Sequence, residues 1–119
     1  MISELLLMAM IAVESGNNNM AVGDNGAGIG CLQIHKCVID DVNQIYGEKY
    51  RWPESAFDRK MSITICELYL RHYATQHATN EQLARIWNGG PKGYKKTATL
   101  KYWAKVKKQI GRHTFGELL

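Results

Sequence analysis

The sequence has little of what would cross-link or interrupt a small protein. Its 119 residues include three cysteines, Cys31, Cys37 and Cys66, and two prolines. Three thiols cannot all pair with one another, and none stands in a Cys-x-x-Cys pair. We therefore expect buried thiols rather than a disulfide framework. No His and Cys residues have the spacing of metal ligands, so neither a metal nor a cofactor is expected.

Low-complexity segments, internal repeats and long linkers are also absent. A length of 119 residues predicts one domain over residues 1–119 with a core of its own. The net charge of +4 suits an anionic partner such as nucleic acid, a membrane surface or an acidic cell wall. The charge alone does not choose among them, and the late lysines also fit a solvated helix face.

The apolar run at residues 5–13 lacks the marks of an export signal. Glu4 precedes it in place of Lys or Arg, and no small-x-small cleavage site follows before Glu14. The run is also too short to span a bilayer. It predicts a buried helix over residues 3–15, which Ser3 caps and Gly16 ends, in a chain with no export signal of its own.

Hydrophobic spacing predicts four further helices, and the one that ends at residue 77 is expected to be the longest. Their ranges are residues 36–46, 58 or 60 to 77, 80–87 and 98–110. Gly47 and Gly111 are expected to end the first and last of them, Asn80 to cap the third, and the run from Asn88 to Pro91 to terminate it. Residues 48–55 are expected to be irregular.

A glycine-rich segment separates the first two helices. Asp24-Asn25-Gly26 is a tight-turn signal, and it predicts a small hairpin that joins residues 20–22 to residues 29–31. The expected fold class is therefore mainly α, with about five or six helices and a Gly-rich loop or small β-hairpin after the first helix.

Two carboxylates flank this glycine-rich loop in different environments. Glu14 stands at the end of the apolar helix, where burial and the helix C-terminus both disfavour a charged carboxylate. Asp24 stands in a polar loop, where a carboxylate stays ionised. A protonated acid facing a charged base across roughly 6.5–9.5 Å would allow inverting hydrolysis of a glycosidic bond. The alternatives are an exposed last-turn glutamate and an aspartate that bonds only its own turn.

The rest of the loop offers small residues and an amide. Gly28 and Gly30 permit the close approach of a ligand or of another backbone segment. Gln33 carries a donor and an acceptor, so it could orient Glu14 or bind a sugar amide, or it could act only as a structural cap.

Several stretches of the chain resemble one family. They are Glu14-Ser15-Gly16, then Gly26 to Ile34, then the helix with Asp58, Ser62 and Tyr69, then Ala84 to Gly90, and finally Thr99-x-x-Tyr102. Together they resemble soluble lytic transglycosylases and goose-type lysozymes. The resemblance implies a lysozyme-like fold that cleaves the β-1,4 bond between N-acetylmuramic acid and N-acetylglucosamine. It also implies Glu14 as the catalytic acid.

The chain departs from the transglycosylase pattern at three places. Gly28 stands where that pattern usually has Ser, and Trp87 replaces its Tyr. The loop around Asp24 looks more like the goose type, in which a matching aspartate is linked to water activation, and His35 falls where that type tends to have another acid. A transglycosylase would need no second carboxylate, because the sugar's own 6-hydroxyl attacks.

The expected substrate contacts extend beyond the loop. They comprise Gln33, Gly28, Ile29, Trp87, Asn88, Tyr94 and Tyr102, because amides can bind N-acetyl groups and aromatic rings can stack on pyranose faces. Tyr102 and Trp103 are helix neighbours that cannot face the same way. We expect Tyr102 toward the cleft and Trp103 in the core.

The expected partners are peptidoglycan glycan strands or chitin-like oligosaccharides, without nucleic acid or membrane, bound by a monomer. The expected setting is the bacterial cell wall, reached as a phage endolysin made in the cytoplasm or as a domain of a larger secreted or virion protein. Two other classes stay open: a non-catalytic glycan-binding module of the same fold, and a basic nucleic-acid binder without a recognisable motif.

Overall fold

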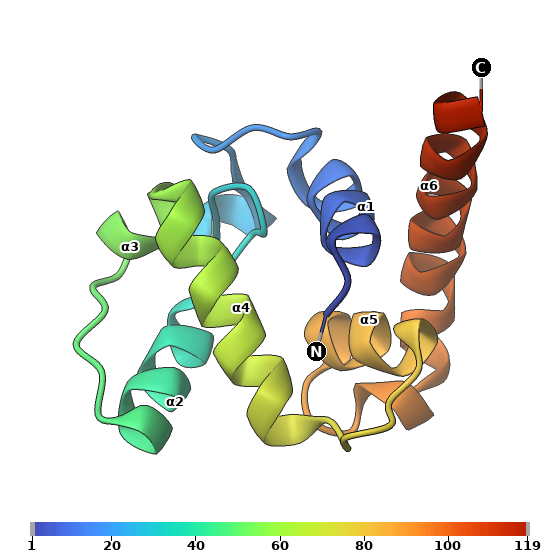
Figure 1. The fold of residues 1–119 in the computed structure, drawn as a ribbon. Helices are drawn as coiled ribbons and strands as arrows, with labels where there is room; N and C mark the ends of the chain where they lie inside the picture. The colour runs from blue at the N-terminus through green and yellow to red at the C-terminus, as the bar shows by residue number, and fades with distance from the viewer. Residues whose placement is uncertain (1, 119) are drawn as a thin grey trace. The chain divides into compact units, whose positions relative to one another are not determined.

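The computed structural model describes residues 2–118, which form six α-helices and one small hairpin (Figure 1). The chain divides into two compact units. One comprises residues 14–69, and the other comprises residues 1–13 and 70–119. Helix α1 (Glu4–Ser15) and helix α4 (Arg59–Tyr73) each contribute to both. The mainly helical class with a hairpin after the first helix is confirmed.

The unit of residues 14–69 begins with the hairpin that the Asp-Asn-Gly signal predicts. Val22 pairs with Ile29 and Gly23 with Gly28 in antiparallel register. Three helices follow, and the core of this unit includes Ile34, before α2, and Ile39, Val42, Ile65 and Cys66 in the helices. The elements are β1 (Val22–Gly23), the 3-10 turn η1 (Asp24–Gly26), β2 (Gly28–Ile29), α2 (Lys36–Tyr46), α3 (Glu54–Phe57) and the first part of α4.

Hydrogen bonds and one close backbone approach connect these elements. The Tyr46 hydroxyl donates to the Leu68 carbonyl at 2.9 Å, which joins α2 to α4. The Gly30 N–H donates to the Ala21 carbonyl at 2.8 Å and extends the hairpin. Gly30 has φ of +79°, and a Cβ there would overlap the carbonyl oxygen of Ala56. The loop after β2 therefore lies against α3 only because residue 30 has no side chain.

The other unit is built around α5 (Asn80–Gly89), which packs against both η2 (Gly93–Lys95) and α6 (Leu100–Leu118). The 3-10 turn η3 (Thr97–Thr99) leads into α6. Its buried apolar residues come from α1, α4, α5 and α6, and they are Leu6, Leu7, Ala9, Met10, Ile11, Leu70, Leu83, Ala84, Ile86, Tyr102 and Val106.

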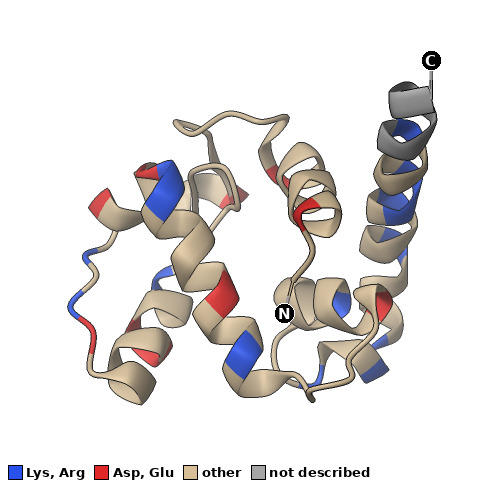
Figure 2. Cartoon of the chain, viewed as in Figure 1, with Lys and Arg blue, Asp and Glu red and all other residues tan. Residues whose placement is uncertain are grey.

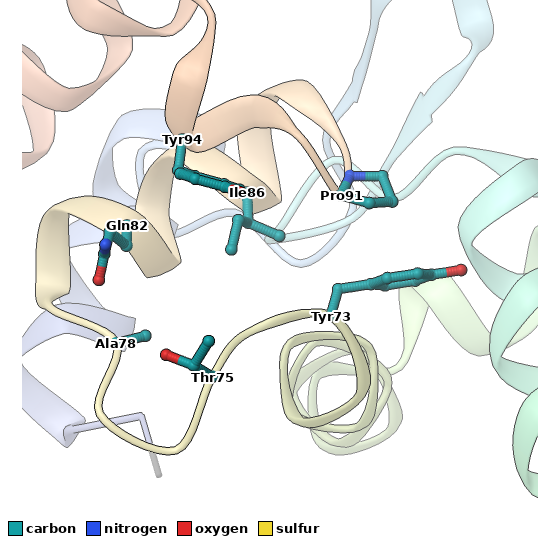
Figure 3. A pocket seen from close by; sticks show the side chains of 7 residues that line it. All are labelled: Tyr73, Thr75, Ala78, Gln82, Ile86, Pro91 and Tyr94. Carbon is teal, nitrogen blue, oxygen red and sulfur yellow. The ribbon is translucent and has the colours of Figure 1, made fainter.

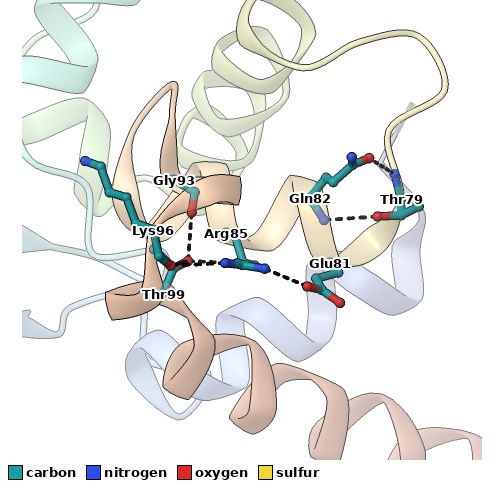
Figure 4. Close-up of polar contacts among 7 residues, drawn as sticks. All are labelled: Thr79, Glu81, Gln82, Arg85, Gly93, Lys96 and Thr99. Atoms are coloured by element: carbon teal, nitrogen blue, oxygen red, sulfur yellow. Dashed lines mark hydrogen bonds and ion pairs between the residues drawn. The ribbon is translucent and has the colours of Figure 1, made fainter.

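A polar network fixes the segment between α5 and α6 (Figure 4). The Arg85 side chain donates to Thr99 Oγ1 at 2.8 Å, to Glu81 Oε2 at 2.7 Å and to the Lys96 carbonyl at 3.1 Å. Thr99 is 2% exposed, and its Oγ1 also lies 2.8 Å from the Gly93 carbonyl. The buried Thr99 hydroxyl and the Arg85 guanidinium are thereby hydrogen-bonded, which stabilises the irregular segment.

Helix boundaries agree with the sequence in the first half of the chain. Ser3 Oγ accepts from the Leu6 N–H at 3.1 Å as the predicted N-cap of α1, and Gly16 follows the helix with φ of +64°. The bounds of α2 are those predicted, and Gly47 ends it with φ of +67°.

Four boundary predictions are wrong. Helix α4 ends at Tyr73, with Arg71 and His72 in its last turn where cations are favourable, and not at residue 77. Thr79 rather than Asn80 caps α5, because Thr79 and Gln82 form a reciprocal capping box. The segment expected to be irregular contains the start of the short helix α3. Gly111 does not end α6, which continues to Leu118.

Helix α6, rather than α4, is the longest helix, and it carries most of the late positive charge (Figure 2). Lys101, Lys105, Lys107, Lys108 and Arg112 are all exposed on it. This agrees with the interpretation as a solvated helix face. Among the described residues, no helix is both long and apolar enough to cross a membrane.

The three cysteines are free thiols in two environments. Cys31 and Cys66 are buried as predicted, but Cys37 is exposed in the first turn of α2. Burial raises the pKa of the Cys66 thiol well above its usual value, and the nearby charges of Glu14 and Glu67 raise it further. Cys66 is therefore a neutral thiol at physiological pH.

The glycine at position 30 gives a direct test of the fold. Gly30→Ala should lower the free energy of unfolding by about 3 kcal/mol or more, because the new Cβ forces the loop away from Ala56 in addition to the cost of a positive φ. Gly47→Ala is the matched control: its φ is +67°, but a Cβ there meets nothing within 4 Å. It should cost only about 1 kcal/mol. Urea unfolding measures both, and equal losses would contradict the packing argument.

The thiols give a second test. With an aromatic disulfide reagent at pH 9, where an ordinary thiol is mostly ionised, the folded protein should react rapidly at Cys37 alone. Cys66 should stay protonated and unreactive because its pKa is raised. In urea all three thiols should react. Rapid labelling of Cys66 in the folded protein would show that this thiol is not held in an apolar interior.

Candidate active site

Glu14 lies in the last turn of α1 and is half-buried. The turn is fixed by its neighbour: the Ser15 hydroxyl donates to the Cys31 carbonyl at 2.8 Å, and Ser15 Oγ accepts from the Asn18 N–H at 3.1 Å. Gly16 then reverses the chain in a left-handed conformation. The end of α1 is thereby tied to the loop that follows β2, and the position of Glu14 relative to that loop is set.

Glu14 lies near a buried thiol of α4. Its charge is one of those that raise the pKa of Cys66, so the two side chains lie close together. Cys66, Cys31 and Ser62 are all buried, and Cys31 Sγ lies 3.7 Å from Ser62 Oγ. Glu14 is thus half-buried next to buried groups, and its role as the catalytic acid stays a prediction. Among the described residues, no group of three or more His, Cys, Asp and Glu side chains could hold a metal.

Asp24 stands at the tip of the hairpin in a different environment. It has φ of +52° and the next residue, Asn25, has φ of +56°, so two consecutive residues are left-handed. Its Oδ2 lies 2.9 Å from His35 Nε2, and the two side chains are 63% and 44% exposed. The carboxylate thus faces water and a histidine.

Gly28 and Gln33 complete this corner of the hairpin. A Cβ at Gly28 would lie 2.7 Å from Gln33 Oε1 and 3.1 Å from Asp24 Oδ2. Gln33 has φ of +52°, and its Nε2 donates to the Gly30 carbonyl at 3.0 Å and to the Ala21 carbonyl at 3.3 Å. Asp24, Gly28 and Gln33 are therefore brought together. The absent side chain at Gly28 makes room for the other two, and Gln33 braces the hairpin as a structural cap does.

The remaining residues predicted to bind substrate have varied exposure. Ile29, in β2, is 4% exposed. In the unit with residues 70–119, Trp87 is half-buried and Asn88 is exposed at the end of α5, while Tyr94 is 37% exposed in η2.

Tyr102 is the more buried of the two neighbouring aromatic residues on α6. It is 8% exposed, whereas Trp103 is half-buried. The expectation that Trp103 takes the core is therefore wrong, because Tyr102 is the more buried of the two, and the expectation that Tyr102 faces the cleft stays a prediction. The reason is register: Tyr102 and the fully buried Val106 are four residues apart and lie on the same face of the helix.

Sequence reasoning missed two side chains that position the carboxylates. Ser15 is visible in the sequence only as part of a motif, yet its hydroxyl joins two segments 16 residues apart in sequence. His35 is noticeable in the sequence only because goose-type lysozymes tend to have an acidic residue at that place. In the structure it pairs with Asp24, 11 residues away in the sequence. No periodicity or local motif indicates such a pairing, because it depends on how the hairpin folds back.

Comparison with known proteins gives one consistent family. The model of the Transglycosylase SLT domain matches residues 1–110. The lysozyme of Ostrea edulis is 30% identical over 114 residues, which cover 91% of this chain and 81% of that protein. An invertebrate-type lysozyme of Ruditapes philippinarum is 30% identical over 119 residues, which cover 93% of this chain and 84% of that protein.

Solved structures agree with the sequence matches. The crystal structure of Tapes japonica lysozyme superposes with a TM-score of 0.76 at 29% identity and covers 89% of each chain. That of inhibitor-bound lysozyme from Meretrix lusoria has a TM-score of 0.78 at 28% identity and covers 90% of this chain and 89% of that one. The chain therefore belongs to the SLT transglycosylase domain family, with a lysozyme-like fold and the activity of that family, a glycosidase that cleaves peptidoglycan.

Proposed function

We propose that this glycosidase transfers the cleaved glycan to water, as a lysozyme, with Glu14 as general acid and Asp24 as the second carboxylate. The observation that carries the proposal is the placement of Asp24. Its carboxylate contacts His35 and lies over Gly28, exposed to solvent, so it is available to a water molecule. The relatives from Ostrea edulis and Ruditapes philippinarum are called lysozymes, which supports the same interpretation.

In the proposed reaction, Glu14 donates its proton to the leaving oxygen of the β-1,4 bond as that bond breaks. The bond joins N-acetylmuramic acid to N-acetylglucosamine. Asp24 accepts a proton from a water molecule as the water oxygen bonds to the anomeric carbon. The net change is the addition of one water across the bond, with inversion at that carbon. Both carboxyl groups return to their starting states by exchanging protons with solvent.

The two environments fit these roles. A general acid must hold its proton near neutral pH, and Glu14 lies half-buried beside the neutral Cys66 thiol. A base must be ionised, and Asp24 is exposed beside a histidine. The pairing of a dry acid with a wet base is the pattern by which one active site performs both steps.

We also propose a binding role for the other predicted residues. Trp87, Asn88, Tyr94 and Tyr102 offer rings and an amide that suit N-acetyl sugars. In the hairpin, Gly28 and Ile29 would provide backbone against which a sugar can lie. The proposed setting is the bacterial cell wall, with a monomeric catalytic domain over residues 1–119. Neither of the two lysozyme relatives supports a phage origin.

Product analysis separates hydrolysis from transglycosylation. Mass spectrometry of peptidoglycan digested by the wild-type protein should find reducing ends that carry one added water, because Asp24 activates water. Products with 1,6-anhydromuramic ends would instead mean that the sugar's own 6-hydroxyl attacks, and the hydrolase assignment would then be abandoned.

Asp24→Asn tests the second carboxylate. It should lower kcat by roughly 10²–10⁴-fold, the usual contribution of a general base. Asp40→Asn is the matched control, since Asp40 is an exposed aspartate in the same unit that is paired with Lys36 at 2.8 Å. The control should keep wild-type activity. An Asp24→Asn enzyme with full activity and anhydro products would assign the transglycosylase route.

Glu14→Gln tests catalysis itself. The amide cannot donate a proton to the leaving oxygen, so cleavage should fall below detection while binding to cell wall persists. Glu4→Gln, an exposed change in the first turn of the same helix, should leave activity unchanged. Undiminished cleavage by Glu14→Gln would refute the assigned acid. Wall binding without cleavage by the wild-type protein would favour the non-catalytic glycan-binding module.

A further inference from the structure

The side chain of Asp24 has one contact that could hold it in place. Asp24 lies between two strands of two residues each, and its side chain is 63% exposed. An exposed side chain at such a tip exchanges among rotamers unless another group binds it. His35 Nε2 lies 2.9 Å from Asp24 Oδ2, and among the described residues no other side chain bonds this carboxylate. The orientation of the carboxylate therefore depends on His35.

The backbone of His35 is fixed on both sides. Ile34, which is fully buried, forms an antiparallel bridge to Ile29. The Ile34 N–H donates to the Ile29 carbonyl at 2.9 Å, and the Ile34 carbonyl accepts from the Ile29 N–H at 3.1 Å. On the other side, the His35 carbonyl accepts from the Val38 N–H at 3.0 Å in the first turn of α2. The imidazole thus extends from a fixed support to the carboxylate at the hairpin tip.

This contact occupies one carboxylate oxygen and leaves the other. A carboxylate that acts as a base only accepts hydrogen bonds, so the imidazole donates to it through the Nε2–H group. The oxygen that it reaches, Oδ2, is also the one that faces Gly28, where a Cβ would lie 3.1 Å away. Oδ1 of Asp24 has no hydrogen-bond partner among the residues that the structure describes. Oδ1 is therefore the oxygen left to accept a proton from water.

A cavity of about 190 Å³ in the unit with residues 70–119 offers no replacement for this pair (Figure 3). The polar groups that line it are the phenols of Tyr73 and Tyr94, the amide of Gln82 and the hydroxyl of Thr75. None of the described residues around it carries a carboxylate or an imidazole. A carboxylate base for water is thus found at the hairpin and not in this cavity.

We infer that His35 is a positioning residue that determines whether water or a sugar hydroxyl attacks. By holding Oδ2, His35 keeps Oδ1 directed at a water molecule, so that Asp24 takes the water proton as the water oxygen bonds to the anomeric carbon. The imidazole itself touches no substrate and exchanges no proton. The inference rests on the proposed function, because it needs Asp24 as the base.

Loss of the imidazole changes the balance between two reactions. The carboxylate then turns away from the productive orientation, and the attack of water becomes slower. Attack by the sugar's own 6-hydroxyl does not use Asp24, because Glu14 takes the hydroxyl proton after giving its own to the leaving oxygen. That reaction keeps its rate, so its share of the products increases.

Two substitutions separate the donated hydrogen bond from the bulk of the ring. Gln at position 35 keeps an N–H donor at about the reach of Nε2, whereas Leu has no donor. His35→Leu should lower kcat for hydrolysis about tenfold and leave KM nearly unchanged, because the base is misplaced and substrate binding is not. His35→Gln should stay within about threefold of wild type. Steady-state cleavage of solubilised peptidoglycan strands measures both variants.

The products of a single digest give a second readout. Mass spectrometry measures the proportion of 1,6-anhydromuramic ends to water-added reducing ends, and this proportion does not depend on how much of the protein is folded. It should increase about tenfold in His35→Leu and stay near the wild-type value in His35→Gln. In an Asp24→Asn background, His35→Leu should change the rate and the proportion by less than about twofold, because the carboxylate that it positions is gone.

His77→Leu is the matched control, because it makes the same change at an exposed histidine that does not line the cavity. It should leave kcat, KM and the product proportion unchanged. Three results would overturn the positioning role of His35. These are an unchanged product proportion in His35→Leu, equal losses in His35→Leu and His35→Gln, and a raised KM with unchanged kcat, which would make His35 a sugar contact.

Failure of the proposed function is detected by a different variant. If Asp24→Asn keeps full hydrolysis, Asp24 is not the base, and the proposed function is rejected together with the role of His35. If Asp24→Asn loses hydrolysis and His35→Leu keeps it, only the role of His35 is rejected.

Discussion

The hydrogen bond from Ser15 to the Cys31 carbonyl is the interaction on which the candidate active site depends. It joins the last turn of α1 to the loop after β2, and the Asn18 N–H bonds the same hydroxyl from the other side. Glu14 precedes this anchor, and the hairpin that carries Asp24 lies between its two ends. The two carboxylates are therefore held in one frame, although nine residues separate them in the sequence. A catalytic pair needs such a frame because misplacement by about 1 Å costs large factors in rate.

The hairpin illustrates how one small residue affects several others. Gly28 leaves the space that Gln33 Oε1 and the Asp24 carboxylate fill, and Gly30 lets the following loop reach the backbone of Ala56. A serine at position 28, as in the transglycosylase pattern, would crowd both neighbours. The departure from that pattern is thus explained by packing. Where the pattern has a serine, this chain has a glycine, which leaves space for the Asp24 carboxylate. Gln33 closes the arrangement through its bonds to the Ala21 and Gly30 carbonyls.

Sequence reasoning predicted the features that depend on local chemistry. The N-cap of α1, the bounds of α2 and the presence of the hairpin follow from Ser3, Gly47 and the Asp24-Asn25-Gly26 turn, each of which acts within a few residues. It chose the wrong N-cap for α5, because the neighbouring Thr79 and Asn80 are both good capping residues. It also ended α6 too early, because a single exposed glycine, Gly111, is too weak a signal to end a helix. The His35–Asp24 and Arg85–Thr99 pairs could not be predicted, because each depends on tertiary folding.

The contrast between Glu14 and Asp24 is produced by the secondary structure and not by the carboxyl groups themselves. A helix that is apolar on nearly all sides brings its last turn against the buried thiol of Cys66, which burial keeps neutral. A two-residue strand followed by consecutive left-handed residues instead holds Asp24 out in water beside His35. A carboxylate at position 14 would be half-buried and one at position 24 would be exposed, whichever of the two acidic residues stood there. The proposed chemistry therefore belongs to the positions, and a transglycosylase relative without Asp24 could keep the acid while the acceptor changed from water to a sugar hydroxyl.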